Sequence, residues 1–339
     1  MTSAPLELTR DQILGHRRRV GALDQRLPPG AVSLRRAAWA GLQDSMPRAA
    51  LLSIHARVEG AEPDAWADPS LAQVWGPRFS VFVVPAEDAA LFTVGRYPDD
   101  ARGRRVAEET AARLHEVLDG RRMRDRDAAS EMVGHPFHIR YATTTGTIRI
   151  RWEGALAPTI WAVPRPSIEP RDARLELGRR YLHVFGPSIP SAFANWAGVG
   201  AREARGAFDG LAAELTAAQS LVGDGWILSE DEGSFLATPD RAAPARLLPS
   251  GDAFYLLWGA DRELLVANAT RRAELWTSRV WPGAVLVDGE VVGVWRRANA
   301  DLSIDAWRRL SPAERRAVEA EAASLPLPGA RGAVQVRWS

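Results

Sequence analysis

The sequence predicts an α+β fold in which pairs of short helices alternate with β-hairpins. In three successive stretches, apolar residues recur first at helical spacing and then at alternating spacing, and the last hundred residues are mostly strand-like. A length of 339 residues, with 46% hydrophobic and 25% charged residues, suits several packed domains. We therefore expect units at residues 1–98, 99–168 and 169–240, and a β-rich, barrel-like C-terminal module with a terminal helix at 241–339.

The first unit is expected to contain three helices and a hairpin. A basic helix over residues 8–23 ends at a Pro-Pro-Gly stop, and two further helices follow over residues 33–41 and 47–58. Residues 72–84 are strand-like on either side of a Gly-Pro-Arg turn, which predicts a β-hairpin. Helices followed by a hairpin in this order are typical of a winged helix.

The second unit repeats this order. Residues 106–118 and 124–133 have helical spacing, with a glycine at the end of each. Apolar and polar residues then alternate over residues 137–152, on both sides of a Thr-Thr-Thr-Gly segment at 143–146. This alternation predicts a second hairpin, or wing, with its tip at 143–146.

The third unit carries an internal repeat. A helix is expected over residues 171–185, and residues 188–209 repeat the spacing of the first unit, since Trp-Ala-Gly-Val at 196–199 matches Trp-Ala-Gly-Leu at 39–42. A glycine between two short helices suits the sharp turn of a helix-turn-helix. A third hairpin is expected over residues 226–237. The alternative is coincidence in a chain rich in alanine and arginine.

The C-terminal module is expected to be mainly β-structure. Residues 255–258, 264–266 and 285–295 are strand-like, and Asp288-Gly289 suits a two-residue hairpin turn. Residues 311–324 begin with Ser-Pro-Ala-Glu, a capping box with proline in the first turn, and predict the terminal helix.

Composition excludes several kinds of chemistry. The chain has no cysteine, and all 43 of its Lys and Arg residues are arginine, so disulfides, thiolate metal sites and lysine Schiff bases are excluded. The six histidines are scattered, and we expect neither a metal ion nor a cofactor. No stretch has the length of a membrane span or the pattern of a signal peptide, so we expect a cytoplasmic protein that does not contact a membrane.

Nucleic-acid binding is predicted from local charge, because the whole chain carries only +1. Residues 1–60 hold nine arginines against five acidic residues, and residues 101–151 hold eleven against seven. Solvated helix faces are the alternative explanation. In the predicted wings and helix ends, however, guanidinium groups suit phosphate contacts. The candidate DNA-binding residues are Arg48, Arg140, Thr143, Thr144, Thr145, Arg149 and Arg151.

Gln43, Asp44 and Ser45 form the strongest candidate for chemistry, at the predicted turn between two helices. An amide beside a carboxylate can orient a water and stabilise a developing cation. In the alternative, Asp44 or Ser45 caps the helix that follows. His55 lies on that helix, where a satisfied histidine is the expected outcome.

Three ordered segments resemble the winged-helix DNA glycosylases of the AlkZ/YcaQ type. They are residues 41–58, beginning Gly-Leu-Gln-Asp-Ser-Met-Pro-Arg, residues 84–88 and residues 285–296, and the likeness extends over nearly the whole chain. The resemblance implies three tandem winged helices in a C-shaped DNA-binding body. It also implies a Gln-Xaa-Gln or Gln-Xaa-Asp motif where Gln43-Asp44-Ser45 stands. Gln43 matches this motif, whereas Ser45 is shorter than the family residue, and Asp44 is the neighbouring carboxylate that would replace it.

The activity implied by the resemblance is hydrolysis of the N-glycosidic bond of alkylated purines in double-stranded DNA, by a monofunctional enzyme that we expect to be a monomer. Alkylation already makes the base a good leaving group, so the enzyme must mainly hold a water and stabilise the cationic sugar. One alternative is a winged-helix DNA-binding protein or regulator without catalysis, although the alanine-rich residues 49–56 offer few base-reading side chains. Another is a protein that uses winged helices as interaction modules.

Overall fold

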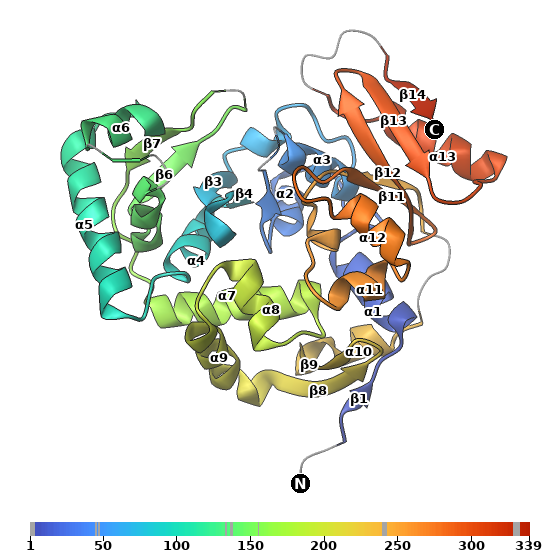
Figure 1. Ribbon diagram of the computed structural model, residues 1–339, viewed down its shortest axis with the longest axis horizontal. Coiled ribbons are helices and arrows are strands. Elements are labelled where there is room, and N and C mark those ends of the chain that lie inside the picture. The colour runs from blue at the N-terminus through green and yellow to red at the C-terminus, as the bar shows by residue number, and fades with distance from the viewer. Residues whose placement is uncertain are drawn as a thin grey trace.

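A computed structural model of the chain describes residues 4–44, 46, 48–132, 134–135, 138–154, 156–238, 243–327 and 333–339. Within these residues it is a mixed α/β structure with three three-stranded sheets and one five-stranded sheet. The sheets and their helices follow one another around an arc, with the second three-stranded unit and the five-stranded sheet on opposite sides (Figure 1). No helix of the described residues is long and apolar enough to cross a membrane.

The first unit has the predicted order of helices and hairpin. A capping box between Thr9 and Gln12 begins the first helix. The predicted hairpin is confirmed, because β3 and β4 pair antiparallel from Leu71↔Pro85 to Trp75↔Val81. The elements are α1 (Arg10–Val20), α2 (Ala31–Ala37), β2 (Leu42–Gln43), α3 (Ala49–Arg57), β3 (Leu71–Trp75), β4 (Val81–Pro85) and α4 (Ala89–Val94), with the sheet order β2-β4-β3.

The second unit has its hairpin later in the chain than predicted. Its elements are α5 (Ala101–Leu118), β5 (Met123–Arg124), α6 (Asp125–Glu131), η4 (His138–Thr145), β6 (Ile148–Arg151) and β7 (Thr159–Ala162), with the sheet order β5-β7-β6. The hairpin is formed by β6 and β7, which pair from Ile148↔Ala162 to Arg151↔Thr159.

The prediction of a hairpin at 137–152 with a tip at 143–146 is therefore wrong. Residues 138–145 form a 3-10 helix, in which the hydroxyls of Thr143, Thr144 and Thr145 each donate to the carbonyl three residues earlier, at 2.6–2.8 Å. Threonine can satisfy the local backbone in this way as readily as it can occupy a strand. The three side chains are at most 3% exposed, so they form no groove-inserting tip. Phe137 lies outside the described residues.

The sheet of the third unit has an edge strand that comes from the beginning of the chain. Its elements are α7 (Pro170–Phe185), α8 (Pro190–Ala197), α9 (Ala201–Gly210), β8 (Leu215–Ser220), β9 (Gly223–Leu228) and α10 (Glu232–Leu236). The strand β1 (Leu6–Glu7) pairs parallel to β8, through Leu6↔Ala218. The predicted hairpin at 226–237 is wrong, because β9 pairs with β8 and residues 232–236 form α10.

Two glycines show why the Trp-Ala-Gly repeat matters. Gly41 and Gly198 both have positive φ, +81° and +70°, which residues with a side chain adopt only under strain. Each is also crowded, since a Cβ on Gly41 would lie 2.9 Å from Cε1 of Phe92 and one on Gly198 would lie 2.8 Å from the nitrogen of Arg78. The predicted glycine turn is confirmed at both places.

The C-terminal sheet is open, which corrects the expected barrel-like element. Its strands lie in the order β10-β11-β12-β13-β14, with β10 and β14 at its two edges. The hairpin at Asp288-Gly289 is confirmed, as is the capping box of Ser311 and Glu314. The elements are β10 (Arg246–Leu248), α11 (Asp261–Leu265), α12 (Ala269–Leu275), β11 (Gly283–Val287), β12 (Glu290–Ala298), β13 (Asp301–Ala306), α13 (Pro312–Ala323) and β14 (Gln335–Trp338).

The strands expected at 255–258 and 264–266 are absent from the described structure. A 3-10 turn at Ala253–Tyr255 and helix α11 occupy these regions instead. The Asp252 side chain accepts from the nitrogen of Phe254, and the Tyr255 hydroxyl donates to the carbonyls of Pro249 and Pro282. These apolar runs are buried in a core cluster that also contains residues of the first and third units, rather than in a sheet.

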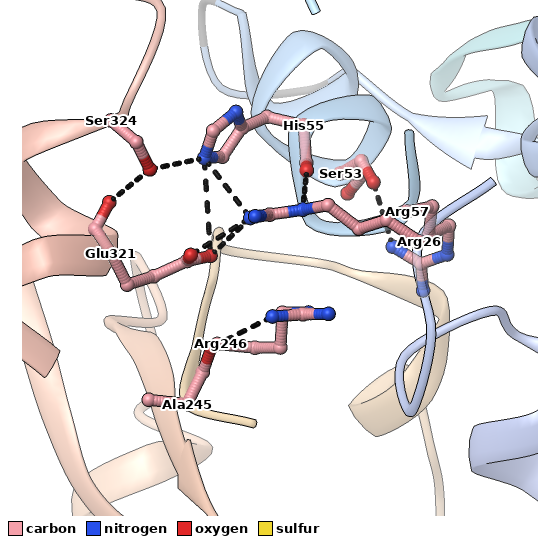
Figure 2. Close-up of polar contacts among 8 residues, drawn as sticks. All are labelled: Arg26, Ser53, His55, Arg57, Ala245, Arg246, Glu321 and Ser324. Carbon is pink, nitrogen blue, oxygen red and sulfur yellow. Dashed lines mark hydrogen bonds and ion pairs between the residues drawn. The ribbon is translucent and has the colours of Figure 1, made fainter. Parts of the chain in front are cut away.

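A buried polar cluster joins the C-terminal module to the first unit (Figure 2). Arg26 donates to both carboxylate oxygens of Glu321 on α13, at 2.7 and 2.8 Å. His55 on α3 contacts Ser324 and Arg26 through Nε2. Burial, with the positive charges of Arg26 and Arg246, lowers the pKa of His55 to about 3. His55 is therefore a neutral structural residue that helps to hold α13 against α3.

Removal of the Glu321 carboxylate should loosen this junction. Glu321→Ala leaves Arg26 without its ion-pair partner in a largely buried setting, which costs about 3 kcal/mol of unfolding free energy. A clear fall in Tm, followed by circular dichroism, is the expected result. Glu319→Ala removes an exposed carboxylate of the same helix, which accepts a hydrogen bond from Nε1 of Trp338, and serves as the control. An equal fall for both variants would contradict a special role for the cluster.

Candidate active site

Gln43 and Asp44 lie between the edge strand β2 and the start of α3. The strand is fixed by pairing with β4, through Leu42↔Val83 and Gln43↔Phe82, and the Asp44 nitrogen donates to the Val81 carbonyl at 2.8 Å. The backbone on both sides of the pair is therefore tied to the sheet of the first unit. Ser45, the third predicted residue, lies outside the described residues.

The Gln43 side chain is half-buried and oriented by an arginine. Its Oε1 accepts from Nη2 of Arg78 at 2.7 Å, and the other terminal nitrogen of Arg78 donates to the Trp196 carbonyl at 2.6 Å. The Gln43 NH₂ group faces Gly251, where a Cβ would lie 3.2 Å from Nε2. The amide is thus held with its oxygen engaged, and its NH₂ group lies against Gly251, where a side chain would crowd it.

Asp44 is fully buried, and three donors surround its carboxylate. Oδ1 accepts from the Ala50 nitrogen at 3.1 Å, whereas Oδ2 accepts from Nε2 of Gln73 at 3.1 Å and lies 3.5 Å from Nη1 of Arg48. Burial raises the pKa of Asp44 to about 6, although these donors and the Arg48 charge act in the opposite direction. Since Ala50 is in the first turn of α3, Asp44 caps this helix as the structural alternative expected.

Gln73 is the most important residue that the sequence analysis missed. It is buried in β3, and it contacts both Asp44 and the backbone of Trp152 just after β6. Its Oε1 accepts from the Trp152 nitrogen at 2.7 Å, and its Nε2 donates to the Trp152 carbonyl at 3.2 Å. Gln73 therefore connects the candidate carboxylate to the hairpin of the second unit. A buried amide within an otherwise apolar strand was the available signal.

Trp66 brings together two of the predicted DNA-binding arginines. The guanidinium carbons of Arg48 and Arg151 lie 3.7 and 4.2 Å from the centroid of its ring. Arg48 also donates to the Trp152 carbonyl, at 3.4 Å. The side chain of Arg151 is 38% exposed, which leaves part of its guanidinium accessible beside the hairpin. Of these two cations, Arg48 also contacts Asp44, with Nη1 3.5 Å from Oδ2.

The other predicted DNA-binding residues do not join this group. Arg140 donates to the Phe79 carbonyl at 3.2 Å, and half-buried Arg149 donates to the Gly146 carbonyl at 3.4 Å. Thr143, Thr144 and Thr145 lie inside the second unit, as described above. Among the described residues, no cluster of three or more His, Cys, Asp or Glu side chains is placed to hold a metal ion.

Comparisons with known proteins agree on one family. A family model described as "DNA glycosylase AlkZ-like" matches residues 36–326. The interstrand DNA cross-link repair glycosylase of Streptomyces sahachiroi is 24% identical over 301 residues, which cover 76% of this chain and 79% of that protein. The solved structure of DNA glycosylase AlkZ from the same organism has the same fold, with a TM-score of 0.77, 19% identity and coverage of 98% of this chain and 100% of that chain.

The raised pKa of Asp44 predicts a pH-dependent stability. The unfolded chain releases this proton near the ordinary value of 3.8, whereas the folded protein keeps it up to about pH 6. Because the folded state binds more protons in this interval, the stability that Asp44 contributes falls as pH rises from about 4 to about 6. We expect the Tm of the wild type minus that of Asp44→Asn to fall across this interval and to level off above it. The corresponding loss in the free energy of unfolding is roughly 3 kcal/mol or less.

Thermal melts of both proteins between pH 4 and pH 8 test this prediction. Asp11→Asn, at an exposed carboxylate of α1, is the control and should follow the wild type. A difference between wild type and Asp44→Asn that stays constant with pH would show that Asp44 does not change its ionisation in this range.

Proposed function

The chain belongs to the AlkZ-like DNA glycosylase family, and on this premise we propose that it hydrolyses the N-glycosidic bond of alkylated purines in double-stranded DNA. The observation that carries the proposal is the pair of Gln43, with an oriented amide, and Asp44, with a buried carboxylate, directly before α3. Gln43 and Asp44 are also the residues that the sequence resemblance assigns to the family motif.

We also propose that the three three-stranded units are three winged helices, divided at about residues 98, 168 and 240. In each unit, helices precede an antiparallel hairpin that carries a third strand at one edge. The likeness to the AlkZ structure extends over 98% of this chain and concerns the fold as a whole. The parallel pairing of β1 with β8 adds the N-terminal residues to the third unit.

The proposed reaction needs little general acid. The water oxygen bonds to C1′ and its proton passes to solvent. The C1′–N bond breaks, and its electron pair stays on the base, which leaves uncharged because alkylation had made it cationic. The enzyme must therefore place the water and lower the energy of the positively charged sugar.

The two side chains differ in what they can contribute. Gln43 is half-buried and its NH₂ group is not engaged by Arg78, so the amide is available to position the water. Asp44 is fully buried, and it acts through its negative charge and through the turn that it fixes. With a pKa of about 6, Asp44 is mostly ionised at neutral pH, as stabilisation of a cation requires.

The substrate class is proposed from the family likeness. The Streptomyces sahachiroi relative is named for the repair of interstrand DNA cross-links. Purines alkylated at N7, whether the adduct is a single methyl group or joins two strands, share the cationic leaving group that this site suits. Release of N7-methylguanine from alkylated duplex DNA is the simplest test.

Substitution of Gln43 or Asp44 should slow base release and leave DNA binding intact. We expect Gln43→Ala and Asp44→Asn each to lower the single-turnover rate at pH 7.5 by about 10²-fold or more, the scale of lost positioning or electrostatic stabilisation. The released base is measured by chromatography. The affinity for the same duplex should change little.

Ser45→Gln provides the sharper comparison, because it restores the second amide expected for the family. A gain in base release would identify this chain as a weakened or specialised glycosylase. If the wild type, Ser45→Gln and Ser45→Asp all bind alkylated duplex and release no base, the proposal of catalysis is wrong and DNA binding alone remains.

Arg151 is expected to contact a DNA phosphate. Each phosphate that a protein neutralises lowers the slope of log K against log salt by about 0.9, so Arg151→Ala should flatten the slope by about that amount on any duplex sequence. Fluorescence anisotropy over a salt series measures it. Arg105→Ala removes a 68% exposed guanidinium from α5 and is the control. A weaker affinity with an unchanged slope would indicate that Arg151 supports Trp66 rather than DNA.

A further inference from the structure

A cavity lies beside the turn that carries the candidate site. Its volume is about 450 Å³, within the usual range for pockets that bind small molecules. The last turn of α1, the end of α2 and its following turn, and the end of α7 form its walls. Gly41 and Leu42, which directly precede Gln43, belong to its lining. Its polar and aromatic lining side chains are Arg17, Arg19, Arg36, Arg57, Trp39 and His183.

The charge of this cavity is positive. No aspartate or glutamate among the described residues lines it. Two of its four arginines are neutralised from outside, since Arg57 pairs with Asp252 at 2.6 Å and Arg17 with Asp261 at 3.2 Å. Arg19 and Arg36 have no carboxylate within 4.0 Å among the described residues. The cavity thus holds two uncompensated guanidinium groups.

The arginines of α1 are held in place by backbone carbonyls. Arg17 is 3% exposed and donates to the carbonyls of Phe185 and Gly186, and Arg19 donates to the carbonyl of Ser234. Nη1 of each of these arginines is buried and has no hydrogen-bond partner in the described structure. Because both nitrogens are shielded from solvent, these two arginines act on a ligand in the cavity mainly through their positive charge.

Trp39 provides an aromatic wall with a fixed orientation. The Arg180 guanidinium lies 4.7 Å from the centroid of its ring and donates to the Trp39 carbonyl, and the His183 ring meets its edge at 5.2 Å. A fixed indole beside uncompensated guanidinium groups suits a ligand that carries both a planar ring and an anion.

We propose that this cavity binds the phosphate of a nucleotide, with Arg19 and Arg36 as its main ligands and Trp39 beside the attached nucleoside. Guanidinium groups match phosphate oxygens in pairs, which favours phosphate over a single-charged carboxylate. The phosphate can belong to a DNA strand that passes the candidate site or to a free mononucleotide. Both carry the same chemistry, and binding does not depend on base release.

Isothermal titration calorimetry of the full chain at constant ionic strength tests the proposal. Deoxyguanosine 5′-monophosphate and inorganic phosphate should both bind, and deoxyguanosine without phosphate should bind at least tenfold more weakly. Arg36→Gln and Arg19→Gln should each weaken nucleotide binding by about tenfold, as expected for one charge-assisted hydrogen bond. Arg36 is exposed, so Arg36→Gln should fold normally.

Arg35→Gln is the matched control, because Arg35 is the preceding residue of α2, lies outside the cavity lining and pairs with Glu87. The proposal is overturned if neither phosphate nor the nucleotide binds in the millimolar range, or if Arg35→Gln and Arg36→Gln have equal effects.

Competition with duplex DNA identifies the source of the phosphate. If the cavity binds a DNA phosphate, the nucleotide should displace a fluorescent duplex, and Arg36→Gln should weaken duplex binding by a similar factor. If the cavity binds a free nucleotide, the heat of nucleotide binding should persist when the protein is saturated with duplex. Loss of base release in Gln43→Ala leaves either result unchanged, so this proposal and the proposed catalysis fail independently.

Discussion

The burial of the Asp44 carboxylate is the constraint on which the candidate site depends. A carboxylate without access to water needs hydrogen-bond donors from the protein itself. Here the donors come from the start of α3, from β3 and from Arg48. Because Gln73 and Arg48 also bind the backbone of Trp152, the same carboxylate fixes the hairpin of the second unit against the first. Three elements that are distant in sequence therefore fix the position of this carboxylate.

The exclusive use of arginine shapes the rest of the molecule. Arginine can stack on an aromatic ring and still donate hydrogen bonds from the edge of its guanidinium, which lysine cannot do in the same way. Arg78 stacks on Trp258 while it donates to Gln43, and Arg180 stacks on Trp39 while it donates to Asp88. Charged groups thus belong to the packing between units, and net charge says little about where the cations act.

Local sequence patterns predicted those elements whose cause is local. Glycines at the two Trp-Ala-Gly turns, the Asp288-Gly289 hairpin and the Ser311 capping box each depend on a few adjacent residues, and each is present. The threonines at 143–145 do not identify one local structure. Their β-branching favours a strand, whereas their hydroxyls can also stabilise the 3-10 helix that is present. The strand predicted at residues 255–258 is absent because an apolar run does not specify which surface buries it.

The candidate site was predictable only in part for the same reason. Gln43 and Asp44 stand out because an amide and a carboxylate are adjacent at a turn before a helix. Gln73 and Arg78 lie about thirty residues away, and Trp152 about a hundred, so no short pattern connects them with Asp44. Their roles follow from the packing of the first two units, which a single sequence does not specify.

The pairing of β1 with β8 has a consequence for how the chain is made. Leu6 leaves the ribosome long before its partner Ala218. At about 5–20 residues per second, this strand waits roughly 10–40 seconds for the sheet that it completes. Throughout that time its backbone donors and acceptors are an unpaired edge, open to any strand of the first two units that folds earlier. A segment of only two residues offers little to such a competitor, and its shortness protects the nascent chain from mispairing.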